Sequence, residues 1–112
     1  IGHLNEMCEN SGVSSEIYFS DIELLPGVKS LAESGIIPGG TKRNLDFLDG
    51  FTSFGSEIDK NQQYILADAQ TSGGLLISLP AKQAETFKDA MGDHVKIIGS
   101  TINARSTRII VK

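Results

Sequence analysis

Cysteine and tryptophan are almost absent from this chain of 112 residues, which has one cysteine, Cys8, and no tryptophan. A single thiol excludes an internal disulfide and, with no signal-like segment, predicts a reducing, cytoplasmic location. The two histidines, His3 and His94, lie far apart and no Cys-x-x-Cys pair occurs, so no zinc site is expected. Cys8 falls on the apolar face of a predicted helix, which favours a buried, inert thiol over a nucleophile.

Clustered charge and long apolar runs are missing as well. The net charge is −4, and the lysines and arginines are scattered, which argues against a nucleic-acid partner. No apolar run reaches the roughly 18 residues that a membrane-spanning helix needs. Hydrophobic residues make up 39% and charged residues 21%, a composition typical of a globular domain rather than a disordered one. The length predicts one domain over residues 1–112.

Apolar spacing, together with glycine and proline, predicts several helices. Helices are expected over residues 1–10, ended by Gly12; over 28–34, closed by Gly35; and from Pro80, closed by Gly92. Residues 36–41 are expected to be a loop, because a proline and two glycines disfavour regular structure. The arrangement of residues 42–62 stays open.

Short β-prone runs predict the strands. Strands are expected at residues 16–19, 75–79, 95–98 and 107–111. The run 75–79 is nearly all apolar, so we expect that strand to be buried on both faces. The mixture predicts an α/β (α+β) fold, a layered sandwich with one mixed sheet and helices packed on it.

Two paired-glycine runs are the candidate sites of chemistry. In the first, Pro38-Gly39-Gly40-Thr41-Lys42-Arg43-Asn44, the glycines let backbone N–H groups converge on an anion, and an arginine can bind phosphate through two nitrogens. In the second, Asp68-Ala69-Gln70-Thr71-Ser72-Gly73-Gly74, hydroxyls and glycines precede the expected buried strand. Spacing alone favours tight turns or close backbone packing at both. Asp68 is a weak metal or polar-network candidate, and a turn or cap role is the simpler interpretation.

Four stretches of the chain resemble the C-terminal domain of selenophosphate synthetases. They are Ile1-Gly2-His3-Leu4 with Glu6-Met7-Cys8, Leu24-Leu25-Pro26-Gly27, Ile37 to Asn44, and Asp68 to Leu76, where Ala69 stands in place of the family's usual proline. All four occur in order over most of the chain. The chain also opens without an initiator methionine or a helix cap, so we expect a C-terminal fragment of a larger two-domain enzyme.

The resemblance implies a fold like the C-terminal domain of aminoimidazole ribonucleotide synthetase and a part in making selenophosphate, AMP and phosphate from selenide and ATP. Mg and ATP would be bound mainly by an N-terminal ATP-binding domain, through which such enzymes form a homodimer. The fragment alone is expected to be inactive and to hold no catalytic or metal-binding residue. Given the resemblance, we consider two interpretations of the glycine runs equally supported: that they contact phosphate or the active cleft, and that they only support the fold. The candidates to face phosphate or the active cleft are Gly39, Gly40, Thr41, Arg43, Asn44, Thr71, Ser72, Gly73 and Gly74.

Two other functions stay open. One is a different synthetase or kinase of the same superfamily, although the two glycine runs together argue against it. The other is a non-catalytic module that binds an anion or a protein partner. The coding sequence upstream of Ile1 would distinguish the freestanding module from the synthetase.

Overall fold

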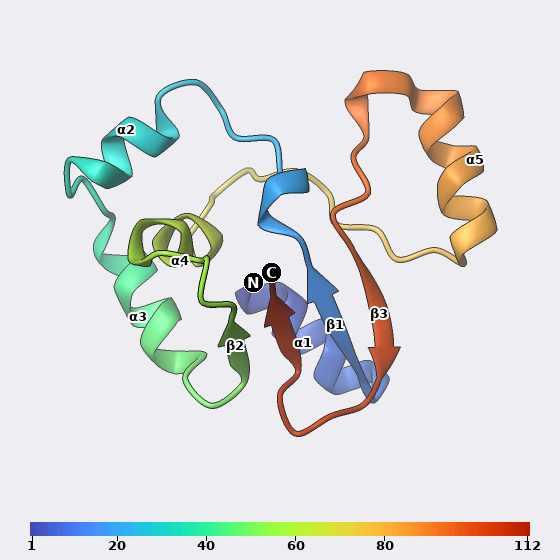
Figure 1. Ribbon diagram of the computed structural model, residues 1–112, viewed down its shortest axis with the longest axis horizontal. Coiled ribbons are helices and arrows are strands. Elements are labelled where there is room, and N and C mark those ends of the chain that lie inside the picture. The colour runs from blue at the N-terminus through green and yellow to red at the C-terminus, as the bar shows by residue number, and fades with distance from the viewer.

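A computed structural model describes residues 1–112, in which four strands form one mixed sheet. The sheet order is β2-β4-β1-β3, with β3 antiparallel to β1, and with β4 parallel to both β1 and β2 (Figure 1). The strands are β1 (Val13–Ile17), β2 (Thr52–Phe54), β3 (Gly99–Asn103) and β4 (Ile109–Val111). The predicted α/β class with a mixed sheet is therefore confirmed.

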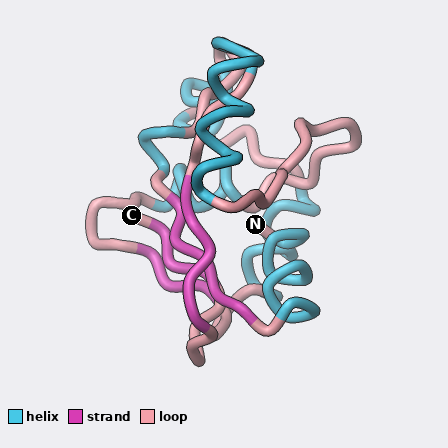
Figure 2. Tube along the Cα trace, turned by 90° about the vertical axis from the view of Figure 1, so that its right-hand side faces the viewer, coloured by secondary structure: helices cyan, strands magenta, loops and turns pink.

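Five α-helices and two short 3-10 turns complete the fold. They are α1 (Gly2–Ser11), η1 (Phe19–Asp21), α2 (Val28–Glu33), α3 (Gly39–Phe47), α4 (Lys60–Leu66), α5 (Ala81–Met91) and η2 (Gly92–His94). Helix α1 lies against one face of the sheet (Figures 1 and 2), and α2 and α3 both pack on α4. None of these helices has the length and apolar character needed to cross a membrane.

The core forms where the middle strands meet α1 and the segment before α4. Its buried cluster contains Ile17, Ile58, Ile109 and Val111, and the two cluster residues from β4, Ile109 and Val111, are completely inaccessible. Cys8, on the buried face of α1, is 2% exposed, and its thiol lies 3.5 Å from the Ser15 hydroxyl. Its predicted burial is confirmed.

Two side-chain clusters join distant parts of the chain around this core. The Arg108 guanidinium donates to Asn5 Oδ1 at 3.2 Å and to Glu9 at 2.6 Å, and it lies 4.4 Å from the centre of the Phe51 ring. At the other end of β4, the Lys112 ammonium donates to the Glu16 carboxylate at 2.9 Å. This hydrogen bond lowers the pKa of Glu16 and raises the pKa of Lys112.

The predicted helix ends are confirmed, whereas residues 36–41 are not a loop throughout. Gly12 and Gly35 adopt positive φ values of 63° and 75° just after their helices, and Gly92 follows α5 at φ 60°. Helix α3 begins at Gly39, with Pro38 as its N-cap. Proline and glycine are tolerated there because the N–H groups of a first helical turn have no intrahelical partner in any case.

The strand predicted at residues 75–79 is wrong. The segment forms no strand, and Leu75 is 91% exposed. An apolar run favours burial, but a strand also needs a neighbouring strand to bond with. The sheet ends at β3, so residues 75–79 have no such neighbour. The strand predicted at 95–98 begins instead at Gly99, where any side chain would overlap the Glu16 carbonyl oxygen. Close pairing of β3 with β1 thus depends on this glycine.

Candidate functional site

The first turn of α3 and the segment that follows α4 are joined by two hydrogen bonds. Thr41 Oγ1 donates to Asp68 Oδ1 at 3.0 Å, and Asn44 Nδ2 donates to the carbonyl oxygen of Ala67 at 3.1 Å. These contacts link residues 27 and 23 positions apart in the chain. The two glycine-containing runs therefore meet in space. We refer to their contact as the glycine junction, formed by Gly40, Thr41, Asn44, Ala67, Asp68 and Ala69.

Gly40 allows this close approach. A Cβ atom added at Gly40 would lie 3.2 Å from the Cβ of Ala69, which is tighter than ordinary van der Waals contact. Thr41 and Ala67 are 1% and 2% exposed, so the centre of the junction is dry. Paired glycines in such a run suit either anion binding or close backbone approach, and at Gly40 the structure shows the second.

Three donors remain available beside the junction. The backbone N–H groups of Gly39 and Gly40 make no hydrogen bond within the protein, as expected for a first helical turn. The exposed Arg43 side chain folds back over this turn, with Nη1 placed 3.7 Å from where a Cβ at Gly39 would be. A helix N-terminus and a guanidinium both favour anions, such as phosphate or a carboxylate.

The second run leaves the junction as an open, extended segment. Gln70 N–H donates to the Asp68 carbonyl oxygen, and no backbone hydrogen bond involves any residue from 71 to 79. Thr71, Ser72, Gly73 and Gly74 are all exposed, so their hydroxyl and amide groups are free to contact another molecule or domain. The Ile1 nitrogen donates to the Leu66 carbonyl oxygen at 2.9 Å, so the first residue of the chain lies beside the same junction.

The candidate residues thus differ in what they have to offer. Gly39, Gly40 and Arg43 present unused donors, whereas Thr41 and Asn44 use their side-chain donors within the junction. No hydrogen bond joins residues 71–74 to α3 directly. Asp68, which the sequence suggested chiefly as a turn residue, accepts the Thr41 hydroxyl. Nothing in the local pattern around Asp68 signals that contact.

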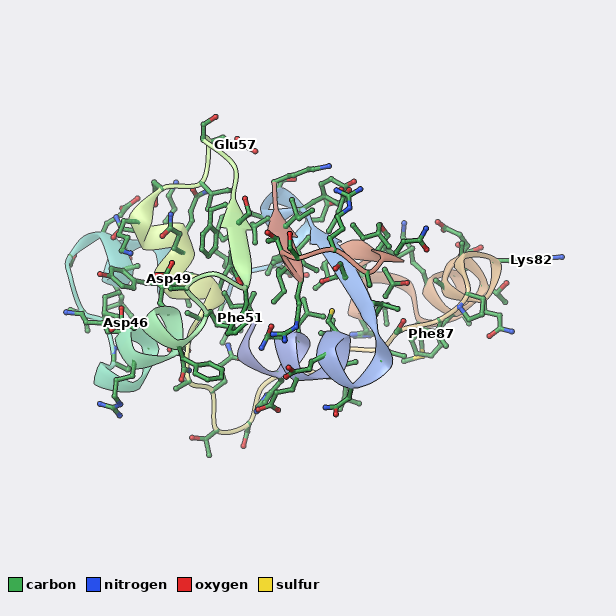
Figure 3. All side chains as sticks on the ribbon, turned by 90° about the horizontal axis from the view of Figure 1, so that it is seen from below. Asp46, Asp49, Phe51, Glu57, Lys82 and Phe87 are labelled. Atoms are coloured by element: carbon green, nitrogen blue, oxygen red, sulfur yellow. The ribbon has the colours of Figure 1, made fainter.

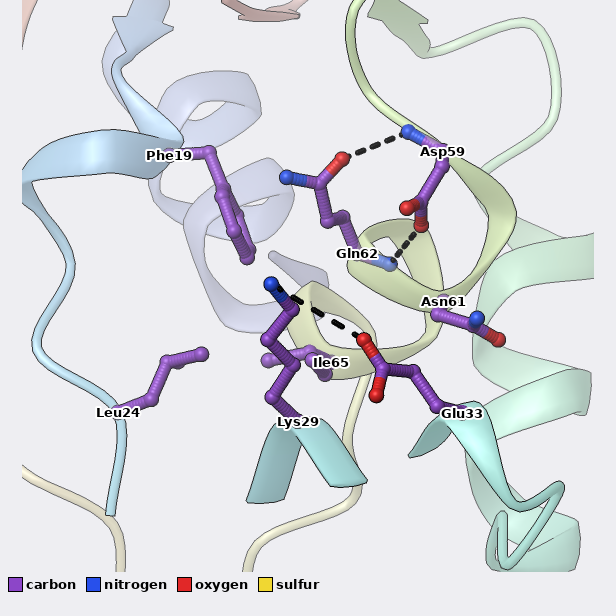
Figure 4. A pocket seen from close by; sticks show the side chains of 8 residues that line it. All are labelled: Phe19, Leu24, Lys29, Glu33, Asp59, Asn61, Gln62 and Ile65. Atoms are coloured by element: carbon purple, nitrogen blue, oxygen red, sulfur yellow. Dashed lines mark hydrogen bonds and ion pairs between the residues drawn. The ribbon is translucent and has the colours of Figure 1, made fainter. Parts of the chain in front are cut away.

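A separate cavity of about 90 Å³ lies between α2 and α4 and was not predicted from the sequence (Figure 4). Its lining residues are Phe19, Leu24, Lys29, Glu33, Asp59, Asn61, Gln62 and Ile65. Lys29 and Glu33 form an ion pair at 4.0 Å, so their charges largely offset each other. Asp59, the remaining charged residue of the lining, accepts the Gln62 N–H as the N-cap of α4. None of the sequence-predicted site residues lines the cavity.

Metal ligands are not gathered anywhere in the structure. No group of three or more histidine, cysteine, aspartate or glutamate side chains lies close enough to hold a metal ion. Asp68 is the only acidic residue of the glycine junction, and its carboxylate accepts a hydrogen bond from Thr41. The donors beside the junction fit an anion and do not fit Mg²⁺.

A mixed four-stranded sheet with five α-helices places the chain among α/β domains. More specifically, the chain belongs to the family described as AIR synthase related protein, C-terminal domain, whose family model matches residues 1–112.

Its relatives include several proteins named selenide, water dikinase. The one from Sulfurovum sp. (strain NBC37-1) is 41% identical over 107 residues, which covers 90% of this chain and 29% of that protein. The one from Clostridium botulinum (strain Eklund 17B / Type B) is 38% identical over 115 residues, covering 100% of this chain and 33% of that protein. The one from Pasteurella multocida (strain Pm70) is 45% identical over 96 residues, covering 83% of this chain and 26% of that protein. The resemblance to this family is confirmed, and the chain spans about a third of the relatives' length.

Proposed function

We propose that this chain is the C-terminal domain of a selenide, water dikinase and that its glycine junction forms one wall of the ATP-binding cleft. The relatives support the activity, because they carry that name at 38–45% identity over most of this chain. The single observation that carries the site is the junction itself. It brings two runs, far apart in the sequence, together beside Ile1 with unused donors exposed.

The chemistry of the proposed reaction fits such a wall. Phosphoryl transfer depends mainly on positioning and on stabilising the charge of the transferred group. The N–H groups of Gly39 and Gly40 and the guanidinium of Arg43 would contact phosphate oxygens. The hydroxyls of Thr71 and Ser72 would donate from the second run. Closure of the wall over the phosphates would also exclude water from the reacting group.

The remaining machinery is proposed to lie in a different domain. We place the metal and most nucleotide contacts in an N-terminal ATP-binding domain, because the donors beside the junction suit an anion rather than a metal ion. That domain is the proposed partner of the junction, and the whole enzyme is proposed to be a homodimer. On this proposal the 112-residue chain by itself binds ATP poorly and does not turn over.

The test uses the full-length protein and three single substitutions, Arg43→Ala, Thr71→Ala and Ser72→Ala. We expect Arg43→Ala to lower kcat/KM for selenide-dependent ATP consumption by roughly 10- to 100-fold, because a charge-assisted contact to phosphate is lost. The two hydroxyl deletions should each cost up to about tenfold, the effect of one neutral hydrogen bond. Rates are measured by AMP and phosphate release with and without selenide.

Arg105→Ala is the matched control, because Arg105 is exposed and lies in the connection between β3 and β4. It should leave kcat/KM unchanged. Wild-type rates in all three test variants would reduce the runs to scaffolding. ATP consumption that requires a ribonucleotide instead of selenide would identify a different synthetase of the superfamily. Phosphate binding by the full-length protein with no turnover on either substrate would identify a binding module.

A further inference from the structure

Asp68 lies at the last fixed point before a long unbonded segment. It follows Ala67, the C-cap of α4, and its N–H donates to the Ile65 carbonyl oxygen at 3.3 Å. After the Gln70 N–H bond at 3.1 Å, no backbone hydrogen bond occurs until Pro80 accepts one. The path of residues 71–74 is therefore set by how the turn at Asp68 is held.

The turn at Asp68 is held from α3, through side chains. Thr41 is 1% exposed, and Asp68 is the one hydrogen-bond partner of its hydroxyl. Asn44, one helical turn further along α3, holds the neighbouring Ala67 carbonyl. The close packing of Gly40 against Ala69 brings the same turn of α3 against the residue after Asp68. Ala67 and the first two residues of the second run, Asp68 and Ala69, thus rest on residues 40–44 of α3.

We infer that Asp68 is a positioning residue, whose hydrogen bond from Thr41 aligns the Thr71–Gly74 segment with the N-terminus of α3 for phosphate binding. This inference rests on the proposed function, and it adds a residue that would act through Thr41 rather than by touching the substrate. It requires an acceptor at position 68 and a hydroxyl at position 41. It does not require a negative charge at position 68.

Because the inference requires a hydrogen-bond acceptor at position 68 but no negative charge, the variants separate these two properties. Asp68→Ala removes the acceptor, and Thr41→Val removes the donor while keeping nearly the same shape. Asp68→Asn keeps an oxygen that accepts from Thr41 but removes the charge. The double variant Asp68→Ala/Thr41→Val tests whether the two side chains act as one unit.

In the full-length protein we expect Asp68→Ala and Thr41→Val each to lower kcat/KM for selenide-dependent ATP consumption by about tenfold or more, because misplacing a binding group is costly. The double variant should lose no more than either single variant. Asp68→Asn should stay within about threefold of wild type, since it preserves the acceptor. Hydrogen–deuterium exchange of a peptide covering residues 66–70 should rise equally in both single variants.

Asp59→Ala is the matched control. Asp59 caps the other end of the same helix, accepting the Gln62 N–H at 2.9 Å, so its loss should weaken α4 without changing kcat/KM. Loss of activity in Asp68→Asn with normal activity in Thr41→Val would overturn the inference, because Asp68 would then contact the substrate or a metal directly. Wild-type rates in both Asp68→Ala and Thr41→Val would also overturn it.

The exchange measurement separates this inference from the proposed function. Failure of the wild-type protein to consume ATP with selenide would refute the proposed function alone. Unequal or absent changes in exchange at residues 66–70 would refute the role of the Thr41–Asp68 bond, whatever the activity.

Discussion

At the scale of single residues, the neighbouring glycines 39 and 40 are chemically identical but differ in their surroundings. An added Cβ at Gly39 meets only the flexible tip of Arg43, at 3.7 Å. At Gly40 it meets the Cβ of Ala69 at 3.2 Å, and this atom is tied to the backbone. Since both glycines lie in the first turn of α3, their intrinsic helix preferences are similar, and the difference between them isolates the packing at the junction.

We therefore predict that Gly39→Ala is neutral or stabilises the protein by up to about 1 kcal/mol, because alanine loses less backbone entropy on folding than glycine. Gly40→Ala should be less stable than Gly39→Ala by about 1 kcal/mol, the lower end of the cost of overpacking. Denaturant midpoints of the two variants check this. Equal midpoints would show that Ala69 moves aside freely and that the junction is not tightly packed.

At the scale of elements, Arg108 ties α1 to the loop that precedes β2. Its guanidinium bonds Asn5 and Glu9 of α1 and lies over Phe51, and its side chain is only 22% exposed. Asn5 is 2% exposed, and Arg108 is the one donor to its Oδ1. Loss of Arg108 would therefore leave a buried acceptor without a partner.

Arg108→Ala is predicted to destabilise the protein by about 2 kcal/mol, within the range for a buried polar group that loses its partner. Arg108→Lys should recover only part of this, because an ammonium cannot reproduce two directed hydrogen bonds and the stacking on Phe51. Urea unfolding gives the comparison, with Arg105→Ala as an exposed control expected within about 0.5 kcal/mol of wild type. If the Arg108→Ala protein were as stable as the control, Arg108 would not link α1 to the loop before β2 in any way that contributes to stability.

The sequence correctly predicted three helices whose ends are marked by glycine or proline. The glycines after α1 and α2, and the Pro80 and Gly92 that bracket α5, identified these three helices because caps act over one turn. Helix α4 begins with a capping box, Asp59-x-x-Gln62, which is a local signal of a helix start within the region 42–62. The three residues of β2 are too few to show periodicity. The glycine junction could not be predicted from the sequence, because the contact between Thr41 and Asp68 spans 27 positions and leaves no local pattern.

At the scale of the whole molecule, the protein consists of two parts. We call the segment 75–79 together with α5 the arm, and the sheet with the helices packed around it the body. Seen from below, α5, with Lys82, lies at the opposite end of the molecule from Asp46 on α3 (Figure 3). The radius of gyration is 14.2 Å, against about 13 Å expected for a compact domain of this length. Leu75, Leu76, Ile77 and Leu79 in the segment leading to α5 are all exposed. The stability of the domain should therefore come from the body.

The same substitution at two leucines tests this division. Leu48 is 1% exposed in the body, so Leu48→Ala should cost about 2–5 kcal/mol through lost burial and the cavity left behind. Leu75 is 91% exposed in the arm, so Leu75→Ala should change the free energy of unfolding by no more than about 0.5 kcal/mol. Chemical denaturation of both variants decides the matter. A cost at Leu75 approaching that at Leu48 would mean that the apolar run 75–79 is packed in a core, as its sequence alone predicts, and that the boundary between body and arm lies elsewhere.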